Sequence, residues 1–439
     1  MKMSARELDQ MVVEKLKAEV KPAMGCTEPV AVALAVAKAR ELCLEDAPVL
    51  YDDLRVSVSV SPNIFKNGLA VGIPGTDQVG LVIASALGLV SCHSACGLEV
   101  FSEVKPEDIK TAFSFIKAGK VKIAIADTDK KVLVDATVYN GAEAFGRAVI
   151  EDRHDQFVKL VSHRGELLAI SSEVCKAQNN HPLYDLSIGE ILDIVERLPF
   201  EELRFLLDGY AMNEEMANYG LSKPLGMKVG WTLEENTKKG LLSNDLMNRA
   251  MVLTAAASDA RMSGASLPVM SSNGSGNNGL TAILPIVAYT KTHETSEDAL
   301  ARAAAITHLI NSVIKHNIGR LSALCGCGVA AGTGASVAIT WLMGGSREQV
   351  TGAIQNMVAN TTGMICDGAK VGCALKLATS ASAAVQSALL AVNGVIVPSG
   401  NGIIGKTADD TIVNLGILSK NAMDTVDRVI LDVMLEQVE

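Results

Sequence analysis

Aromatic residues are scarce in this chain of 439 residues: they make up 4% of it, and only two are tryptophans. Since 49% of the residues are hydrophobic all the same, the interior must be built from Ala, Val, Leu, Ile and Met. Side chains of this kind favour closely packed helices over an aromatic-rich β-sandwich. The composition thus predicts a largely helical protein, long enough for two or three domains.

Concentrated positive charge is also missing, because the formal net charge is −10 and no block of Lys or Arg stands out. Nucleic-acid-binding proteins carry such clusters of positive charge, so their absence argues against this class and favours a small-molecule partner. The first 20 residues are charged and amphipathic, and they lack the apolar stretch and cleavage site of a secretory signal. We therefore expect a cytoplasmic location.

One stretch, residues 321–346, carries no charged residue and is long enough to span a membrane. Gly, Cys, Ser and Thr interrupt it, however, and it lacks aromatic belts at its two ends. It is predicted to be a buried core helix, and no membrane partner is expected.

Residues 1–182 are predicted to form an α+β domain, because strand-like alternation of apolar and polar residues appears between helical segments. Helices are expected at 4–20, from 29 to about 43, at 79–90 and at 106–118. The strand-like runs are 54–62, 120–126, 131–139, 156–163 and 166–171. Residues 61–76, rich in Asn, Gly and Pro, are predicted to be a loop-rich connection.

Residues 183–439 are predicted to form a mainly all-α domain. Nearly every segment there is rich in Ala, Leu and Met with helical periodicity, and the breaks are Gly, Ser and Asn clusters. We place the boundary near Pro182, within the polar stretch 176–185. The predicted fold class is therefore α+β.

The chain has nine cysteines, an odd number with dissimilar spacings that fit no disulfide framework. Thiols stay reduced in the cytoplasm, so these cysteines are available for burial, metal binding or catalysis.

Four cysteines of the helical domain are grouped as a soft metal would require. Cys325 and Cys327 begin one helical segment, while Cys366 and Cys373 flank a Gly-containing loop that leads into another. Thiolates suit zinc or an iron–sulfur cluster, and neither a C-x-x-C knuckle nor a paired His supports zinc. Three thiolates on a four-iron cluster would leave one iron open for Lewis-acid catalysis. From spacing alone, ordinary buried core cysteines explain the pattern equally well.

Cys26 lies in the segment 25–29, where a helix should begin with Thr27 as its N-cap and Pro29 in its first turn. The exposed N–H groups of a helix N-terminus stabilise a thiolate, which can then act as a base or nucleophile. A capped turn without a chemical role is the alternative.

Two polar segments are candidates for substrate binding. The Ser/Asn/Gly-rich run 271–279 precedes an apolar helix, so its amides can form a nest for a carboxylate. It lacks the Lys-Ser/Thr ending and the preceding strand of nucleotide-binding loops. In residues 61–68, a lysine is available to a carboxylate or phosphate, and for both segments an ordinary flexible connection remains open. The candidate residues are Asn63, Lys66, Asn67, Ser272, Asn273, Gly274 and Ser275.

Five segments form an ordered set: GCTEP (25–29), SPNIFKNG…IPGT (61–76), SDARMSGASLP with SSNGSGNNG (258–279), LSALC (321–325) and GMICDGAKVGC (363–373). This set resembles the L-cysteine desulfidases and their bacterial relatives, which are allied to the α-chain of iron–sulfur L-serine dehydratases. The resemblance covers nearly the whole chain, and five landmarks in order are far more specific than any one of them.

The resemblance implies an oxygen-sensitive [4Fe-4S] cluster held by Cys325, Cys366 and Cys373, with one iron site open. Relatives can lack the second Cys of the first pair, so Cys325 is preferred and Cys327 is kept as the alternative ligand. The resemblance also implies Cys26 as the proton-abstracting base. Thr27 and Glu28 beside it are further catalytic candidates.

The reaction implied is the α,β-elimination of L-cysteine to pyruvate, ammonia and sulfide, in which a base takes the α-proton while the β-sulfur leaves. The open iron would offset negative charge on the carboxylate or leaving group. Glu28, Asn273 and Ser275 are candidates to hold the substrate's ammonium and carboxylate. No lysine-centred motif is evident, so no pyridoxal phosphate is expected.

Other functions stay open. An L-serine dehydratase would use the same cluster with hydroxide as the leaving group. A non-enzymatic iron–sulfur or thiol redox sensor is a second alternative, although the polar segments favour a small polar substrate. A membrane permease built around 321–346 is a third. The Ala-rich helical domain could also bury a homodimer interface.

Overall fold

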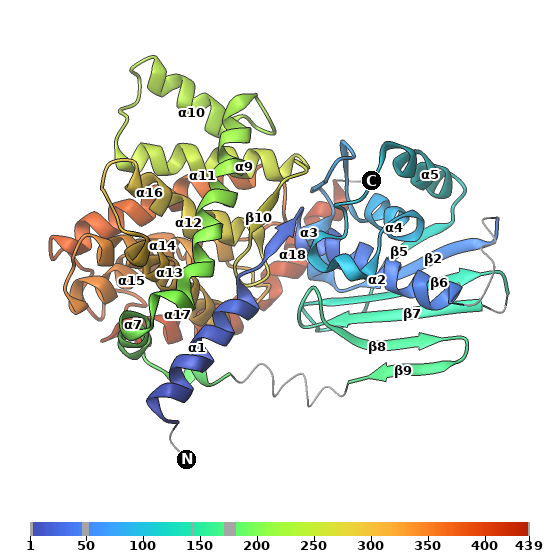
Figure 1. Ribbon diagram of the computed structural model, residues 1–439, viewed down its shortest axis with the longest axis horizontal. Coiled ribbons are helices and arrows are strands. Elements are labelled where there is room, and N and C mark those ends of the chain that lie inside the picture. The colour runs from blue at the N-terminus through green and yellow to red at the C-terminus, as the bar shows by residue number, and fades with distance from the viewer. Residues whose placement is uncertain (1–2, 46–51, 143, 171–180, 438–439) are drawn as a thin grey trace.

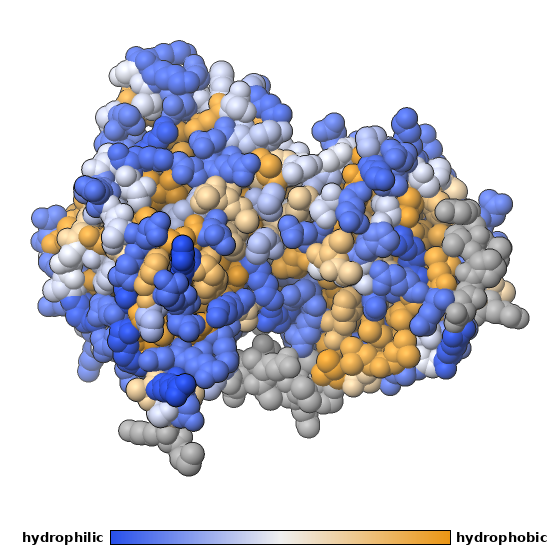
Figure 2. Space-filling model, in the orientation of Figure 1, coloured by the Kyte–Doolittle hydropathy of each residue, from blue (hydrophilic) through white to orange (hydrophobic). Residues whose placement is uncertain are grey.

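The computed structural model describes residues 3–45, 52–142, 144–170 and 181–437, and it has a sheet part and a helical part side by side (Figure 1). A notch separates the two parts at the upper edge of the face shown in Figure 2. Each part has its own hydrophobic core. The predicted α+β class is confirmed. Residues 176–180 of the polar stretch near the expected domain boundary lie outside the described residues.

A six-stranded sheet, in the order β5-β2-β6-β7-β8-β9, forms the base of the sheet part, and only β2 and β5 are parallel. Its strands are β2 (Leu54–Val60), β5 (Val121–Ile125), β6 (Leu133–Asn140), β7 (Ala144–Glu151), β8 (Phe157–Ser162) and β9 (Gly165–Ala169). Five of them match strand-like runs in the sequence. The sequence did not reveal β7, which lacks clean alternation because Gly146 faces the backbone of the covering helix α2 (Thr27–Leu44) at close range.

Apolar helices cover one face of this sheet, with α2 lying on β6 and β7 (Figure 1). The other elements of this part are α3 (Pro62–Gly68), β3 (Gly72–Ile73), β4 (Gln78–Val79), α4 (Leu81–Val90), the 3-10 helix η1 (Ser94–Glu99) and α5 (Pro106–Lys117). The helices expected at 79–90 and 106–118 are confirmed. The loop expected at 61–68 is wrong, because these residues form α3: Ser61 is its N-cap and Pro62 starts it, as prolines often do.

The helical part contains most of the described helices and also takes in the first helix of the chain. Apolar residues of α1 (Ala5–Glu19) belong to its core, not to the core of the sheet part. The others are η2 (Pro182–Asp185), α7 (Ile188–Arg197), α8 (Phe200–Leu203), η3 (Arg204–Leu207), α9 (Asp208–Ser222), α10 (Val229–Lys238), α11 (Leu246–Met262), α12 (Gly276–Thr290), α13 (Glu297–Ile318), α14 (Gly332–Leu342), α15 (Arg347–Thr361), α16 (Cys373–Val392) and α17 (Ala408–Ala422). The π-helix η4 (Gly326–Ala331) leads into α14, and α18 (Asp424–Glu436) ends the described chain beside α3 of the sheet part.

Local sequence explains where many of these helices begin. Reciprocal capping boxes, in which the N-cap hydroxyl and a carboxyl or amide three residues on satisfy free N–H groups, start α1, α7, α15 and α17. Helix α14 is buried along nearly its whole length, so the core helix expected within 321–346 is confirmed. The one described helix that is long and apolar enough to cross a membrane is α16, and 56% of its apolar window is buried.

Gly279 of α12 provides a test of how closely the short strand β10 (Pro268–Met270) packs. A Cβ at this position would lie 1.8 Å from the Met270 carbonyl oxygen. We expect Gly279→Ala to lower the free energy of unfolding by about 1–3 kcal/mol, because β10 must move. Urea unfolding would measure this. The control is Gly189→Ala in α7, where the nearest atom to a new Cβ would be 3.9 Å away, so stability should stay unchanged or rise. Equal effects of both changes would refute the tight contact.

Candidate active site

A short antiparallel ladder brings two distant segments of the chain together. Strand β1 (Pro22–Met24) pairs with β10, with Ala23 opposite Val269. The GCTEP segment follows β1 directly, and the polar loop, residues 271–275, follows β10 directly. Because the strands are antiparallel, the two segments leave the ladder at opposite ends, and these ends are only three residues apart. The strand before the polar loop, which sequence patterns did not reveal, corrects the expectation that none precedes it.

The polar loop is fastened on two sides. Ser271 donates its backbone N–H to the Lys21 carbonyl at 2.8 Å, and Asn273 donates its own to the Glu19 carbonyl at 3.0 Å. Behind the loop, the Ser272 hydroxyl lies 2.9 Å from Nδ1 of His308, a buried residue of α13. Ser275 is the N-cap of α12, and its hydroxyl accepts from the Asn278 N–H, so the loop leads into that helix with the amides of Gly276 and Asn277 in its first turn.

The GCTEP segment begins α2 one residue earlier than expected. Cys26 is the N-cap, with extended backbone angles, and Thr27 is the first helical residue and not the predicted cap. The reason is Gly25, whose φ of +80° turns the chain out of β1 just before the helix. The Thr27 hydroxyl instead donates to the Glu28 carboxylate at 3.3 Å.

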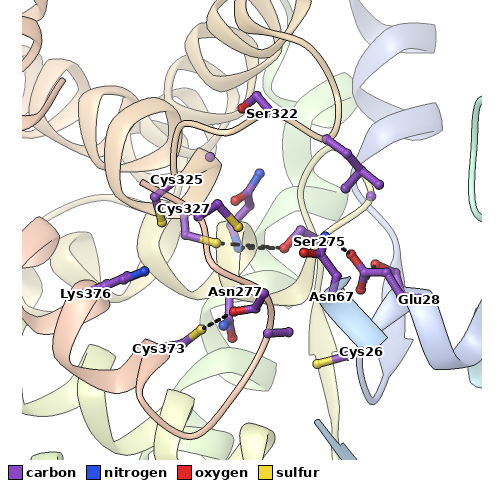
Figure 3. A pocket seen from close by; sticks show the side chains of 18 of the residues that line it. Cys26, Glu28, Asn67, Ser275, Asn277, Ser322, Cys325, Cys327, Cys373 and Lys376 are labelled. Atoms are coloured by element: carbon purple, nitrogen blue, oxygen red, sulfur yellow. Dashed lines mark hydrogen bonds between the residues drawn. The ribbon is translucent and has the colours of Figure 1, made fainter. Parts of the chain in front are cut away.

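These segments and the grouped cysteines line one cavity of about 90 Å³ between the two parts. Figure 3 shows Cys325, Cys327 and Cys373 on one side of it and Cys26, Glu28 and Asn67 on the other. The volume is far below the ~300–1,000 Å³ of sites for drug-sized ligands, so the cavity suits a small one. The other polar or charged lining residues include Thr27, Arg261, Ser275, Asn277, Asn278, Lys315, Arg320, Ser322, Cys366 and Lys376.

Backbone hydrogen bonds hold the two cysteine segments side by side. Cys325 donates its N–H to the Met364 carbonyl at 2.9 Å, and Cys366 donates to the Ala323 carbonyl at 2.7 Å. Cys373 is the first residue of α16, at the far end of the loop that starts at Cys366. The tertiary structure thus brings together all four cysteines that sequence spacing grouped.

The donor set suits a cluster better than a single ion. Among the described residues, no group of three His, Cys, Asp or Glu side chains is close enough together to hold one metal ion. An iron–sulfur cluster spreads its thiolate ligands over different irons, so its cysteines surround a cavity without meeting at one point. Cys325, Cys366 and Cys373 surround the cavity in this way, and Lys376 supplies positive charge next to them.

Cys325 and Cys327 shift each other's pKa in opposite directions. A hydrogen bond from Cys327 lowers the pKa of Cys325 to about 6 against the effect of burial, and the pKa of Cys327 is raised in turn. Burial raises the pKa of Cys366 and raises that of Cys373 to about 11. Cys325 is therefore the thiol of this group that most readily becomes a thiolate ligand.

Burial dominates the chemistry of Cys26. The thiol is almost fully enclosed, and burial raises its pKa to about 12, although Arg261 acts in the opposite direction. The helix N-terminus that suggested a stabilised thiolate is thus outweighed, and Cys26 carries its proton at neutral pH. Its sulfur lies 3.9 Å from the sulfur of Met262 and beside Cys373.

Arg261 joins the two polar segments. Its guanidinium donates to the Gly25 carbonyl at 2.6 Å and to the Asn277 side chain at 2.9 Å. Its Nε has no partner, and Gly276 lies so close that a Cβ there would be 2.4 Å from this nitrogen. A buried cation with an unused donor at the start of α12 suits a carboxylate ligand.

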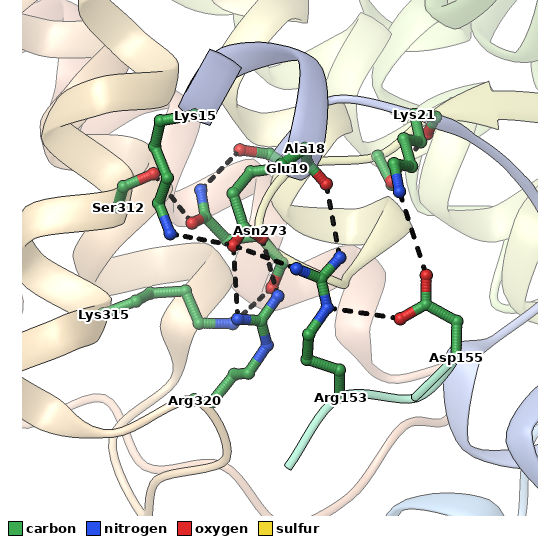
Figure 4. A network of polar contacts seen from close by, with 12 residues as sticks. Lys15, Ala18, Glu19, Lys21, Arg153, Asp155, Asn273, Ser312, Lys315 and Arg320 are labelled. Carbon is green, nitrogen blue, oxygen red and sulfur yellow. Dashed lines mark hydrogen bonds and ion pairs between the residues drawn. The ribbon is translucent and has the colours of Figure 1, made fainter. Parts of the chain in front are cut away.

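A second group of charges closes the side of the cavity toward α1. Glu19 accepts a hydrogen bond from Arg320 at 2.6 Å and lies 3.1 Å from Lys15, and Arg153 approaches from the sheet part (Figure 4). The surrounding cations hold the pKa of Glu19 well below its usual range. Burial lowers the pKa of Lys315 to about 8, and its ammonium donates to the Asn273 carbonyl at 3.2 Å.

Glu28 has polar neighbours from two elements of the sheet part. Asn67 of α3 donates to it at 3.0 Å, and His154, from the turn between β7 and β8, lies 3.9 Å away. Burial lowers the pKa of His154 to about 4, so its ring is neutral at pH 7, and neither ring nitrogen has a partner.

Four of the predicted substrate-binding residues do not line the cavity. Asn63 and Lys66 are buried against α18, where both bond to Asp427. The side chains of Ser272 and Asn273 bond to α13. Their polar atoms are used to hold the site together. Asn67, Gly274 and Ser275 do line the cavity, with Cys26, Thr27 and Glu28.

Several lining residues were missed. Arg261 and Asn278 lie within segments that the sequence marked, but nothing in their pattern showed which side chain turns inward. Lys315, Arg320 and His154 lie in ordinary helical or turn sequence and gave no signal at all.

The serine dehydratase alpha chain family matches residues 80–432. The chain belongs to this family. The match includes the polar loop and the four grouped cysteines but begins after the GCTEP segment. Family membership indicates a lyase-type enzyme, and the family is in general of iron–sulfur type. The cysteine desulfidase part of the resemblance stays a prediction.

Three relatives, each called a UPF0597 protein, match the chain over nearly its whole length. The protein of Alkaliphilus metalliredigens is 55% identical over 435 residues, covering 98% of this chain and 95% of its own. That of Alkaliphilus oremlandii is 54% identical, with 98% of both chains covered, and that of Clostridioides difficile is 50% identical, with 96% and 98% covered. The GCTEP segment and α3 fall within the stretch these relatives share.

Two buried histidines beside the site make stability depend on pH. Burial lowers the pKa of His308 to about 3 and that of His154 to about 4. Below about pH 6.5 the unfolded chain binds protons that the folded protein refuses, so the free energy of unfolding falls as the pH falls. Each histidine should contribute about 1.4 kcal/mol per pH unit between roughly pH 6 and 4.5.

We expect His308→Asn to reduce this slope by the contribution of one histidine, measured by urea unfolding across that range. The control His163→Gln, at an exposed turn position, should leave the slope as it is. A slope unchanged in the His308 variant would contradict the neutral, buried state of this ring.

Proposed function

We propose that the chain is an iron–sulfur lyase that removes the β-substituent of a small L-α-amino acid, with L-cysteine as the substrate and pyruvate, ammonia and sulfide as products. The observation that carries the proposal is the composition of one small cavity. Cysteines that suit a cluster line one wall, and groups that suit an amino acid line the other.

Cys325, Cys366 and Cys373 would hold the cluster. The lowered pKa of Cys325 supports it as the ligand, whereas the raised pKa of Cys327 favours a protonated thiol beside Ser275. When bound, a cluster with three protein ligands supplies a Lewis-acidic iron that polarises a carboxylate or a leaving group. The thiols must lose their protons on binding it, so assembly is coupled to pH.

The rest of the cavity provides for the charges of an amino acid. Glu28, held by Asn67, accepts the substrate ammonium. Arg261, with its free Nε, and the N-terminal amides of α12 take the carboxylate. Glu28 follows Cys26 by two residues, and Arg261 donates to the carbonyl of Gly25 just before it, so a substrate held by both groups lies beside the thiol.

Cys26 accepts the α-proton in this proposal. Burial raises the pKa of this thiol to about 12, and Arg261 beside it acts in the opposite direction, so the thiol must first lose its proton to water before it can act as the base. A thiolate in a buried site is a strong base, as removal of a weakly acidic C–H proton requires. The C–S bond breaks as the proton is taken. The 2-aminoacrylate that forms tautomerises and adds water, giving pyruvate and ammonia.

L-Serine is the second candidate substrate. The same base and charges serve an elimination in which hydroxide leaves, and the name of the matching family favours it. No described residue of the cavity distinguishes a thiol from a hydroxyl at the β-carbon.

Anaerobic purification tests the proposal. We expect brown protein with roughly four irons per chain that releases sulfide from L-cysteine faster than pyruvate from L-serine. Cys366→Ala should lose iron and activity together, while Cys96→Ala, a cysteine of η1 outside the cavity, should keep both. Colourless, iron-free wild-type protein refutes the cluster. If the protein turns over L-serine faster than L-cysteine, L-serine replaces L-cysteine as the proposed substrate.

A second variant separates the base from the cluster. Cys26→Ser keeps the size of the side chain but removes the thiol, so kcat should fall by about 10²–10⁴ as for loss of a general base. Iron content and absorbance should stay at wild-type values, because Cys26 is not a ligand. Loss of iron in this variant would assign Cys26 to the cluster instead.

A further inference from the structure

The cysteine loop comprises residues 366–373. The three consecutive carbonyls of residues 365–367, at and just before its start, each accept a hydrogen bond from a lysine. Lys376 donates to Ile365 at 2.8 Å, and Lys370 donates to Asp367 at 3.0 Å. Both belong to the loop or to α16 directly after it. The Cys366 carbonyl is held differently, because its donor, Lys66 at 3.0 Å, comes from α3 of the sheet part.

Lys66 is among the largest fully buried side chains of the protein, with 1% of its surface exposed. Its ammonium lies 2.6 Å from the Asp427 carboxylate of α18, which also accepts from Asn63 at 2.9 Å. A second cation, Lys131, lies 3.6 Å from the same carboxylate, but its side chain is 41% exposed. One buried ion pair thus joins α3, α18 and the backbone of a cluster cysteine.

The loop is pressed closely onto Lys66. Gly368 has a φ of +92°, and a Cβ there would lie 2.5 Å from the Lys66 carbonyl oxygen. The Cys366 carbonyl and the Gly368 backbone therefore both rest on α3, one on the side chain and one on the main chain of the same residue.

Stability alone does not explain why Lys66 and Asp427 form a buried ion pair. Taking two charges out of water costs about as much as their attraction returns, so an apolar pair of similar size often serves equally well. What an apolar pair cannot do is donate a hydrogen bond to the Cys366 carbonyl. Groups that orient a ligand in this way tune how firmly a metal site is held.

We propose that Lys66 and Asp427 form a clamp that positions Cys366 for the cluster, which makes α18 part of the cluster site although it contributes no ligand. Lys66 is the positioning residue, and Asp427 fixes its ammonium under the loop. The inference rests on the cluster in the proposed function, but not on the identity of the substrate.

Two variants of anaerobic protein separate positioning from stability. Lys66→Met leaves the Asp427 charge buried and lowers both thermal stability and cluster retention. Lys66→Met/Asp427→Leu replaces the pair with apolar side chains, so its thermal midpoint should return toward that of wild type. Both variants should lose iron to a chelator about 10–100-fold faster than wild type. The decay of the cluster absorbance measures this rate.

Asp427→Asn keeps a polar partner for Lys66 and serves as the test if the other variants do not fold. Its rate of iron loss should rise, but by less than in the other two variants. The control Lys131→Met removes the more exposed lysine at the same carboxylate and leaves the hydrogen bond from Lys66 to the Cys366 carbonyl in place, so it should release iron at the wild-type rate.

The outcomes separate the clamp from the proposed function. If the double variant, or Asp427→Asn where that alone folds, releases iron as slowly as wild type, the clamp is refuted while the function stands. If Lys131→Met is as labile as Lys66→Met, general charge loss explains the effect and the clamp is again refuted. Iron-free wild-type protein refutes the clamp and the cluster together.

Discussion

The site depends on the three-residue ladder between β1 and β10. These strands are almost 250 residues apart in the chain, and each leads directly into a segment that lines the cavity. Without the ladder, Cys26 and Glu28 would have no fixed relation to the amides at the start of α12. Arg261 reinforces the same junction by bonding to both sides of it.

Burial is the second constraint, and it sets the charge of several groups in and beside the site. It keeps Cys26 protonated, keeps His154 neutral and brings the pKa of Lys315 to about 8. Such shifts collect where chemistry is done, because a dry site strengthens each remaining interaction. Glu19 escapes the same effect only because three cations surround it.

Two parts of the molecule contribute to one site. The helical part supplies the cysteines and the polar loop, while the sheet part supplies Glu28, Asn67 and His154. The clamp of Lys66 and Asp427 extends this division, since a helix of the sheet part and the last described helix of the chain meet under a cluster cysteine. Relative movement of the two parts would therefore change both walls of the cavity together.

The sequence by itself determined the α+β class, five strands of the sheet, the helical second half and the grouping of the cysteines, because these follow from local periodicity and spacing. It also marked the segments that meet at the cavity. Only the tertiary structure decided which side chains turn inward: Lys66 and Asn63 both bond to the buried Asp427, whereas Arg261 and Lys315 face the cavity. Orientation and protonation arise from contacts between residues hundreds of positions apart, which no local pattern records.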